Sequence, residues 1–169
     1  MMKLHELQND SQPEIIVMIG LPGSGKSTWR DKILAQSDAD YVIVSSDDEI
    51  ERMAAADGLD YTSGFDKYIG KATQVSKQKF KDAIQSKKNV IWDQTNLTEK
   101  KRRGILQQVP REYRKIAVAF EVTDEELQNR LNKRERETGK SIPAKVVSNM
   151  AKSYKPPSKQ EGFDEVYFI

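Results

Sequence analysis

A glycine-rich turn between an apolar segment and a helix-forming segment restricts the fold of this chain more than any other feature. The segment EIIVMIG (14–20) is a continuous apolar run, typical of a strand buried in a parallel sheet. It leads into GLPGSGKST (20–28), which satisfies the phosphate-loop pattern G-x-x-x-x-G-K-[ST]. Because a strand precedes this loop and a helix is expected from about Lys26, the sequence predicts a nucleotide-binding P-loop rather than an ordinary glycine turn.

Each residue type in the loop has a task in binding ATP and Mg²⁺. The glycines let consecutive backbone N–H groups curl around phosphate oxygens, and the helix that follows adds the positive end of its dipole. Lys26 places a cation between the β- and γ-phosphates, Ser27 can bind Mg²⁺, and Thr28 can reach the α-phosphate. The predicted ATP-binding residues of the loop are Gly23, Ser24, Gly25, Lys26, Ser27 and Thr28.

Strand and helix patterns alternate along the rest of the chain. The sequence predicts further strands at 41–45, 89–93, 115–122 and 165–169, and helices at 47–56, 65–86, 98–108, 124–138 and 143–154, with a loop at 57–64. This alternation indicates an α/β P-loop NTPase fold with a central, mostly parallel sheet and helices on both faces. We expect a polar leader at 1–13 and one domain at 14–169, with a helical lid over about 124–142.

Length and composition exclude several classes of protein. The 169 residues suffice for one domain, and the chain has no cysteine and a single histidine, His5, which excludes a disulfide framework, a thiol nucleophile and a Ser-His-Asp triad. The longest apolar run is too short to cross a membrane, and the leader lacks the core of a signal peptide, which fits a cytoplasmic protein. The net charge is negative over residues 1–98 and positive over residues 99–169, so the second part is the better place for an anion.

Two carboxylates follow predicted strands, at the edge of the sheet where ligands bind in open α/β folds. Asp93 ends the third strand and can hold the water shell of Mg²⁺ together with Ser27; the alternative is a carboxylate that caps the next turn. Asp47 follows the second strand and could accept the proton of a substrate hydroxyl as it attacks a γ-phosphate. The alternative for this acidic cluster is structural, because Ser46 and Glu49 form a capping box.

Two arginines border the apolar stripe of the helix at 124–138. Thr123 and Glu126 form a capping box that starts this helix, and its inward face carries Leu127 and Leu131. At 100° per residue, Arg134 falls about 20° to one side of Leu127 and Arg130 falls about 40° further round on the same side. Both arginines could point into the crevice and offset charge on a transferring phosphate, whereas the alternative for Arg130 is an (i, i+4) pair with Glu126.

A second group of basic residues lies between the third and fourth strands. It comprises Lys100, Lys101, Arg102, Arg103, Arg111, Arg114 and Lys115. We expect a solvated surface here, with contact to the phosphate backbone of a nucleic acid as the alternative.

Four segments in this order resemble the 5′-kinase half of the phage polynucleotide kinase/phosphatases: GLPGSGKSTW, SSDDEI, DQTNLTEKKRR and LQNRLNKRERETGKSIP. The chain is also similar to the P-loop module of heterogeneous nuclear ribonucleoprotein U, around WDQTN and GFDEVYFI. The kinase resemblance implies that Asp47 activates the hydroxyl, that Arg134 contacts the transferring phosphate with Arg130 beside it, and that Thr95 and Asn96 belong to the substrate site. The acceptor implied is a 5′-OH end of RNA or DNA.

The chain departs from the phage kinases where those enzymes have two arginines around the catalytic aspartate. Here the corresponding positions are Ser46 and Ile50, and Arg52 is the candidate that could replace the second. The sequence therefore predicts an ATP- and Mg²⁺-dependent polynucleotide 5′-hydroxyl kinase, with two alternatives: a kinase of small hydroxylated molecules, or a non-enzymatic, nucleotide-dependent RNA-binding module. The sequence leaves the oligomeric state open.

Overall fold

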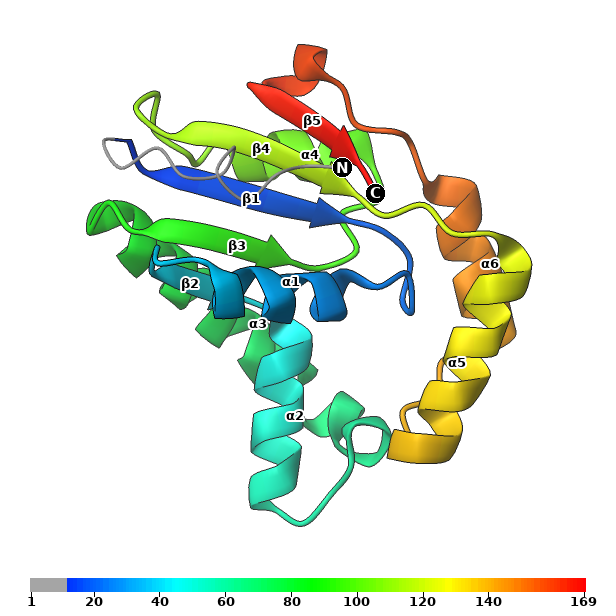
Figure 1. Ribbon diagram of the computed structural model, residues 1–169. Helices are drawn as coiled ribbons and strands as arrows, with labels where there is room; N and C mark the ends of the chain where they lie inside the picture. Colours follow the sequence, from blue (N-terminus) through cyan, green and yellow to red (C-terminus); the bar gives the residue numbers. More distant parts are fainter. Residues whose placement is uncertain (1–11) are drawn as a thin grey trace.

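The apolar segment before the glycine-rich loop forms the central strand of a sheet. In the computed structural model, which describes residues 12–169, five strands lie in the order β2-β3-β1-β4-β5 and every pairing is parallel (Figure 1). The strands are β1 Glu14–Ile19, β2 Tyr41–Val44, β3 Asn89–Asp93, β4 Arg114–Ala119 and β5 Glu165–Phe168. Because the strands are parallel, all their carboxyl ends lie at one edge, and β1 brings the glycine-rich loop to its middle.

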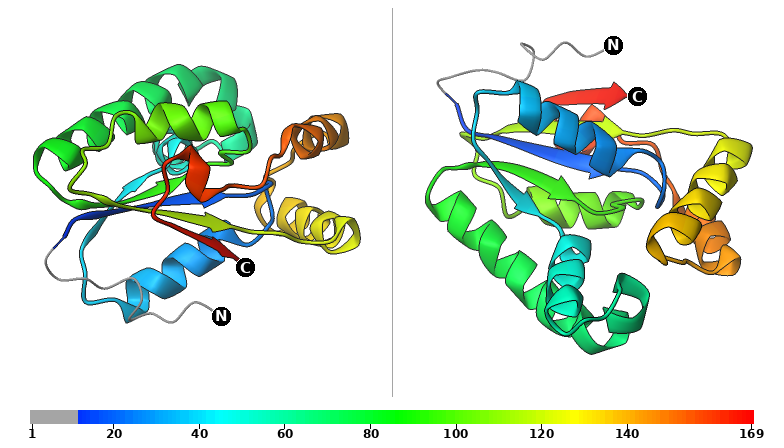
Figure 2. Two further views of the ribbon diagram at one scale, coloured as in Figure 1. Left: turned by 90° about the horizontal axis from the view of Figure 1, so that it is seen from above. Right: turned by 60° about the horizontal axis from the view of Figure 1, so that its bottom comes forward.

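Helices cover both faces of the sheet (Figure 2). They are α1 Lys26–Gln36, α2 Ser46–Ala56, α3 Tyr61–Gln85, α4 Glu99–Leu106, α5 Asp124–Thr138 and α6 Ala144–Ser153, with a 3₁₀ turn, η2, at Lys159–Glu161. Alternate residues of β1 point to opposite faces, so Val17 packs with Phe80 of α3 and Ile105 of α4, whereas Met18 packs with Ile33 of α1. The predicted α/β P-loop fold is confirmed.

Two helix starts differ from the sequence prediction. Helix α3 begins at Tyr61, inside the expected loop at 57–64, because the Asp60 side chain accepts a hydrogen bond from the backbone N–H of Ser63 and caps the helix. In α2 the capping residue is Ser45, which accepts from the backbone N–H of Asp48, so the expected capping box of Ser46 and Glu49 is wrong by one position. The predicted leader lies outside the described residues except for its last two positions.

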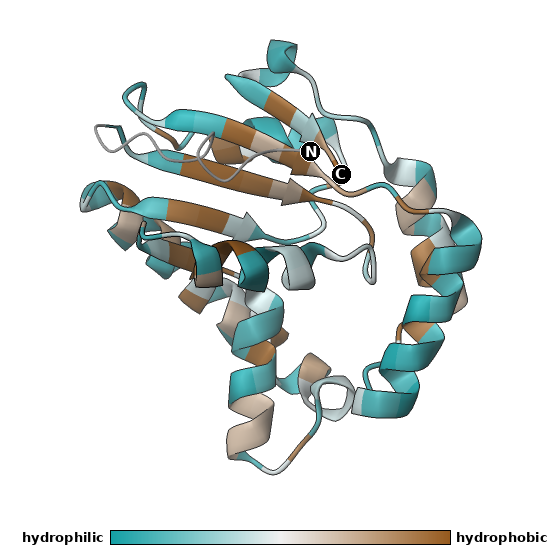
Figure 3. Ribbon diagram, viewed as in Figure 1, coloured by the Kyte–Doolittle hydropathy of each residue, from teal (hydrophilic) through white to brown (hydrophobic). Residues whose placement is uncertain are grey.

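Helices α5 and α6 stand beyond the carboxyl ends of the strands (Figure 1). Leu127 is the buried residue of α5, and α6 has none, whereas the strands carry the apolar core (Figure 3). These two helices are therefore attached to the rest of the molecule with little apolar burial. No helix among residues 12–169 is long and apolar enough to cross a membrane.

The sequence analysis expected the basic group from Lys100 to Lys115 to be a solvated surface. In the structure only part of this group is exposed. Arg102 is 0% exposed and donates hydrogen bonds to both carboxylate oxygens of Glu161, at 2.7 and 2.5 Å, and to the carbonyl oxygens of Asn96 and Leu97. Arg114 pairs with Glu165 and Glu14. Lys100, Lys101, Arg103 and Arg111 remain exposed. Arg102 thus links the β3–α4 loop to the segment before β5 through its hydrogen bonds.

We expect Glu161→Gln to lower the free energy of unfolding by about 3 to 5 kcal/mol, because it leaves the buried Arg102 without its charge partner. Arg103→Ala is the matched control, since Arg103 is exposed and pairs with Glu99 one turn away in the same helix. Its effect should be below about 1 kcal/mol. Urea unfolding of both variants checks this, and equal effects would contradict the assigned role of the buried pair.

Candidate active site

A cavity of about 1060 Å³ opens at the carboxyl ends of the strands. The glycine-rich loop and α1 form one wall, and α5 forms another. We call the third the α2–α3 wall; it is lined by Asp47, Glu51, Leu59, Asp60 and Tyr61. The cavity thus joins the phosphate loop to the predicted lid and to the carboxylate that follows β2.

The glycine-rich loop has the backbone that the sequence pattern predicts. Gly23 and Gly25 have φ values of 82° and 102°, which other residues rarely adopt. A Cβ atom on Gly23 would lie 3.1 Å from Leu131 and 3.4 Å from Leu127, so α5 packs directly over the loop. The two leucines on the inward face of α5 therefore pack the N-terminal half of this helix against the phosphate loop.

Lys26 lies at the base of the loop with its ammonium group directed inward. The Nζ atom donates hydrogen bonds to the carbonyl oxygens of Gly20 and Leu21, at 2.8 and 2.9 Å. Burial lowers the pKa of Lys26 to about 8, although Asp93 and Asp47 act in the opposite direction. A phosphate at this position would raise the pKa of Lys26 again, because a nearby anion favours the charged form.

Asp93 is buried at the end of β3, next to Met18 in the register of the sheet. Its Oδ2 atom accepts a hydrogen bond from Arg30 Nη1 at 2.7 Å, and the same nitrogen donates to Asp48 Oδ2 at 2.8 Å. Burial raises the pKa of Asp93 against the effect of Arg30 and Lys26. Arg30 thus bridges two carboxylates in the cavity that Ser27 also lines, and carboxylate and hydroxyl oxygens are donors that suit Mg²⁺.

Asp47 lines the cavity from the first turn of α2. Its Oδ1 atom accepts a hydrogen bond from the Tyr61 hydroxyl at 2.8 Å, and Lys140 Nζ lies 3.7 Å from Oδ2. Neighbouring residues therefore restrain a carboxylate whose side chain is still 54% exposed. An acceptor hydroxyl can approach it from the cavity.

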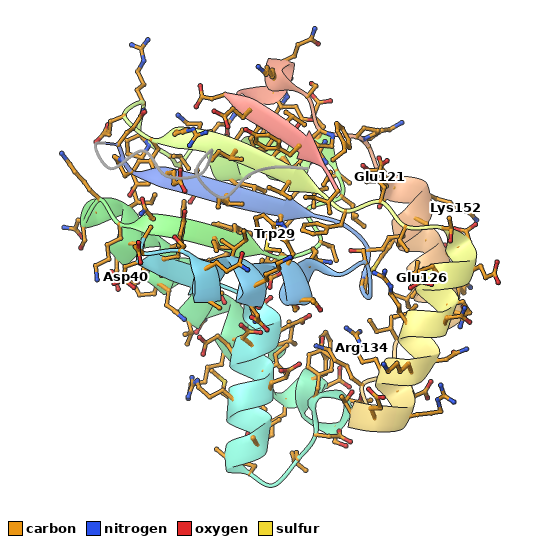
Figure 4. The ribbon with its side chains drawn as sticks, in the orientation of Figure 1. Trp29, Asp40, Glu121, Glu126, Arg134 and Lys152 are labelled. Carbon is orange, nitrogen blue, oxygen red and sulfur yellow. The ribbon has the colours of Figure 1, made fainter. Side chains whose placement is uncertain are left out.

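Arg134 lies on the side of α5 that faces α1 and α2 (Figure 4). Its Nε and Nη2 atoms are buried, yet they make no hydrogen bond to any residue in the described range. Arg130 also lines the cavity, and its Nε atom donates to Glu126 at 2.7 Å, the (i, i+4) pair that was its alternative interpretation. Because two buried guanidinium nitrogens without hydrogen-bond partners are costly, Arg134 marks a position suited to an anion.

The structure does not bring every predicted substrate residue into the cavity. Thr95 lines it, and its carbonyl oxygen accepts a hydrogen bond from the backbone N–H of Gly20. Asn96 is fully buried behind the loop, where its Nδ2 atom donates to the carbonyl oxygen of Met18. Arg52 turns away from the cavity and donates to Glu49, because five residues after Asp47 place it on another side of α2.

Several cavity residues escaped the sequence analysis, among them Arg30, Tyr61 and Lys140, which contact the carboxylates of Asp93 or Asp47. Arg30 lies one turn after Lys26 on α1, so its position was available from helix periodicity. Tyr61 fell in an expected loop, and Lys140 follows the helix that carries Arg134. Their contacts depend on how α3 meets the end of α5, which no local pattern indicates.

The chain is similar to one protein family and to several known proteins. The profile of the AAA domain family matches residues 15–157. The chain is 28% identical over 160 residues to heterogeneous nuclear ribonucleoprotein U-like protein 2 of Mus musculus, and 26% identical over 156 residues to L-seryl-tRNA(Sec) kinase of Methanococcus maripaludis. A chain of the Pnkp1/Rnl/Hen1 RNA repair complex has a similar fold, with a TM-score of 0.67 and 24% identity.

These similarities cover most of this chain but only part of each relative. They span 92%, 89% and 88% of this chain, and 21%, 56% and 46% of the ribonucleoprotein, the kinase and the repair-complex chain. The chain therefore corresponds to one portion of these longer proteins.

We expect Lys26 to make stability depend on pH in alkaline solution. Since the pKa of Lys26 is lowered from 10.5 to about 8, the unfolded chain binds more protons than the folded one between these values. The free energy of unfolding should therefore gain from this residue as the pH rises through this window, by at most about 1.4 kcal/mol per pH unit. Urea unfolding between pH 7.5 and 10 should show this contribution in the unchanged protein and in Lys32→Met, but not in Lys26→Met.

Proposed function

Because the chain belongs to the AAA domain family and its phosphate loop opens into a cavity with a carboxylate and a buried cation, we propose that it is an ATP-dependent phosphotransferase acting on a hydroxyl group. The observation that carries this proposal is the placement of three groups around one cavity: Asp47, Lys26, and Arg134 with two buried nitrogen atoms that lack hydrogen-bond partners among the described residues. Lys26 and Arg134 supply positive charge for a transferring phosphate, and Asp47 supplies a proton acceptor.

In the proposed reaction, ATP lies on the phosphate loop with its γ-phosphate between Lys26 and Arg134. The acceptor hydroxyl donates a hydrogen bond to Asp47, and its oxygen attacks the γ-phosphorus. A new O–P bond forms as the bond from the γ-phosphorus to the β,γ-bridging oxygen breaks. Asp47 takes the hydroxyl proton and ADP leaves. The two cations offset the negative charge on the transferring group.

A divalent ion fits the residues beside the loop. Ser27 would hold it directly and Asp93 through water, once Arg30 yields part of its contact to Asp93. When bound, Mg²⁺ would offset charge on the β- and γ-phosphate oxygens. The backbone N–H groups of Gly23, Gly25 and Thr28 would orient the phosphates, with Arg130 at the rim, whereas the backbone N–H of Ser24 donates to the carbonyl oxygen of Leu21.

We propose the 5′-OH end of RNA or DNA as the acceptor. The order of four segments shared with the phage 5′-kinases supports this choice. The similarities to a ribonucleoprotein and to a chain of an RNA repair complex point to the same class of substrate.

A small hydroxylated acceptor is the second candidate, and the charges of the α2–α3 wall favour it. Glu51 and Asp60 line this wall next to Asp47, Ile50 is fully buried, and Arg52 is bound to Glu49. An acidic wall disfavours an acceptor that carries phosphates close to its hydroxyl group. A neutral or amine-bearing hydroxyl compound avoids this repulsion.

We expect the protein to transfer label from γ-labelled ATP to a 5′-OH oligonucleotide of RNA or DNA in the presence of Mg²⁺. Asp47→Asn should lower kcat by about 10² to 10⁴ without loss of ATP binding, because it removes the proton acceptor and keeps the shape. Asp66→Asn, an exposed aspartate of α3, is the matched control. Transfer only to a nucleoside or another small alcohol would establish the second candidate. ATP binding with salt-sensitive RNA binding but no transfer would instead point to a binding module.

Arg134→Ala should lower kcat by about 10³, because it removes a cation that acts on the transferring phosphate. Arg136→Ala removes an arginine from the outer side of the same helix and should leave kcat within about twofold, in line with a surface substitution. Steady-state kinetics at saturating ATP compare the two variants. Equal losses in both would contradict the role of Arg134 in phosphate transfer.

A further inference from the structure

The first turn of α3 contacts both the candidate base and the end of the helix that covers the cavity. Tyr61 donates to Asp47 Oδ1 at 2.8 Å. The next residue, Thr62, donates through Oγ1 to the carbonyl oxygen of Gly139 at 3.0 Å and accepts from the backbone N–H of Ser141 at 3.2 Å. Adjacent residues of one helical turn therefore connect two parts of the site that lie far apart in the sequence.

Lys140 completes this connection from the other side. Gly139 ends α5 with a φ of 72°, and the chain then turns so that the Lys140 side chain, only 11% exposed, enters the cavity wall. Its Nζ atom lies 2.8 Å from Glu51 Oε1, 3.7 Å from Asp47 Oδ2 and 3.9 Å from the centre of the Tyr61 ring. The ammonium group thus contacts two carboxylates and the face of an aromatic ring.

The two carboxylate oxygens of Asp47 have different partners. Oδ1 accepts a hydrogen bond from Tyr61, whereas Oδ2 lies beyond hydrogen-bond distance of Lys140 and keeps only an ion-pair contact. Oδ2 can therefore accept the hydrogen bond of an incoming hydroxyl group. Without the two neighbours, an aspartate this exposed would be free to change rotamer and would lose its alignment with the attacking oxygen.

We propose that Tyr61 and Lys140 are positioning residues that hold the Asp47 carboxylate with Oδ2 toward the acceptor, and that they do so only while the end of α5 is docked on α3. This inference rests on the proposed phosphotransferase function. It adds a coupling: the helix that brings Arg134 to the phosphate also brings the lysine that aligns the base. Displacement of the end of α5 then disturbs both groups together.

Three variants test this coupling: Tyr61→Phe, Lys140→Met and Lys140→Arg. Tyr61→Phe deletes one hydroxyl group and keeps the ring, while Lys140→Arg keeps the charge that Lys140→Met removes. Tyr68→Phe is the matched tyrosine control, since Tyr68 bonds Asp57 away from the cavity, and Lys133→Met is the matched lysine control on the outer face of α5. Two readouts are needed: kcat and KM for ATP and acceptor, and amide hydrogen exchange of the segment 138–142 without ligand.

We expect kcat to fall about tenfold in Tyr61→Phe and Lys140→Met with the KM for ATP unchanged, because the base is misplaced while the phosphate loop is intact. Lys140→Arg should recover most of the activity. Hydrogen exchange at 138–142 should be faster in Lys140→Met and unchanged in Lys133→Met. A purely structural role would instead lower the amount of folded enzyme without this split between kcat and KM.

The result that overturns the inference is unchanged kcat in both Tyr61→Phe and Lys140→Met, or exchange at 138–142 that is the same in Lys140→Met as in the unchanged protein. Failure of the proposed function has a different signature, namely no transfer by the unchanged protein to any hydroxyl acceptor. The exchange measurement needs no acceptor, so in that case equal exchange still overturns the docking, and faster exchange in Lys140→Met still supports it.

Discussion

The pairing of β1 with β3 determines where the charged groups of the cavity lie. The register sets Met18 beside Asp93, and beyond the strands the backbone N–H of Gly20 bonds to the carbonyl oxygen of Thr95. Asn96, with a φ of 48°, reinforces this junction by donating to Met18 from behind the loop. Because the phosphate loop and the carboxylate are held by one continuous ladder, their separation is fixed before any ligand arrives, and the binding geometry is preorganised.

Buried cations have different partners in the cavity and in the rest of the molecule. Arg102, fully buried in the body of the protein, donates four hydrogen bonds, two of them to the carboxylate of Glu161. Arg134 has two buried nitrogen atoms without a partner in the described part of the chain, and the ammonium group of Lys26 is held mainly by carbonyl oxygens. The contrast is informative because both kinds of burial occur in the same protein. The protein completes the bonding of structural cations and leaves incomplete the bonding of those that face the proposed phosphate.

Local patterns in the sequence were sufficient to predict the sheet, the phosphate loop and the inward side of α5, because each depends on periodicity or on a motif of adjacent residues. The buried strand at Glu14–Ile19 and the cap at Thr123 are examples. The partners of Arg102 and Asp47 could not be foreseen in this way. Glu161 lies 59 positions from Arg102, and Tyr61 lies in a segment whose glycine and aspartates suggested a loop until the Asp60 cap started the helix. Arg52 shows the converse: its residue type suited the substrate site, but its place on α2 did not.

The weak attachment of α5 and α6 has a consequence for how such a protein can change over evolutionary time. The apolar core lies between the sheet and helices α1, α3 and α4, while α5 and α6 together bury one side chain, Leu127. Substitutions on these two helices therefore cost little folding free energy, and their inward residues can be replaced without loss of the sheet or the phosphate loop. Apart from the arginines that face the proposed phosphates, these helices can therefore accumulate mutations that a stability threshold would not remove. A fold of this kind separates the part whose packing holds the sheet and the phosphate loop from a part that can vary without unfolding them.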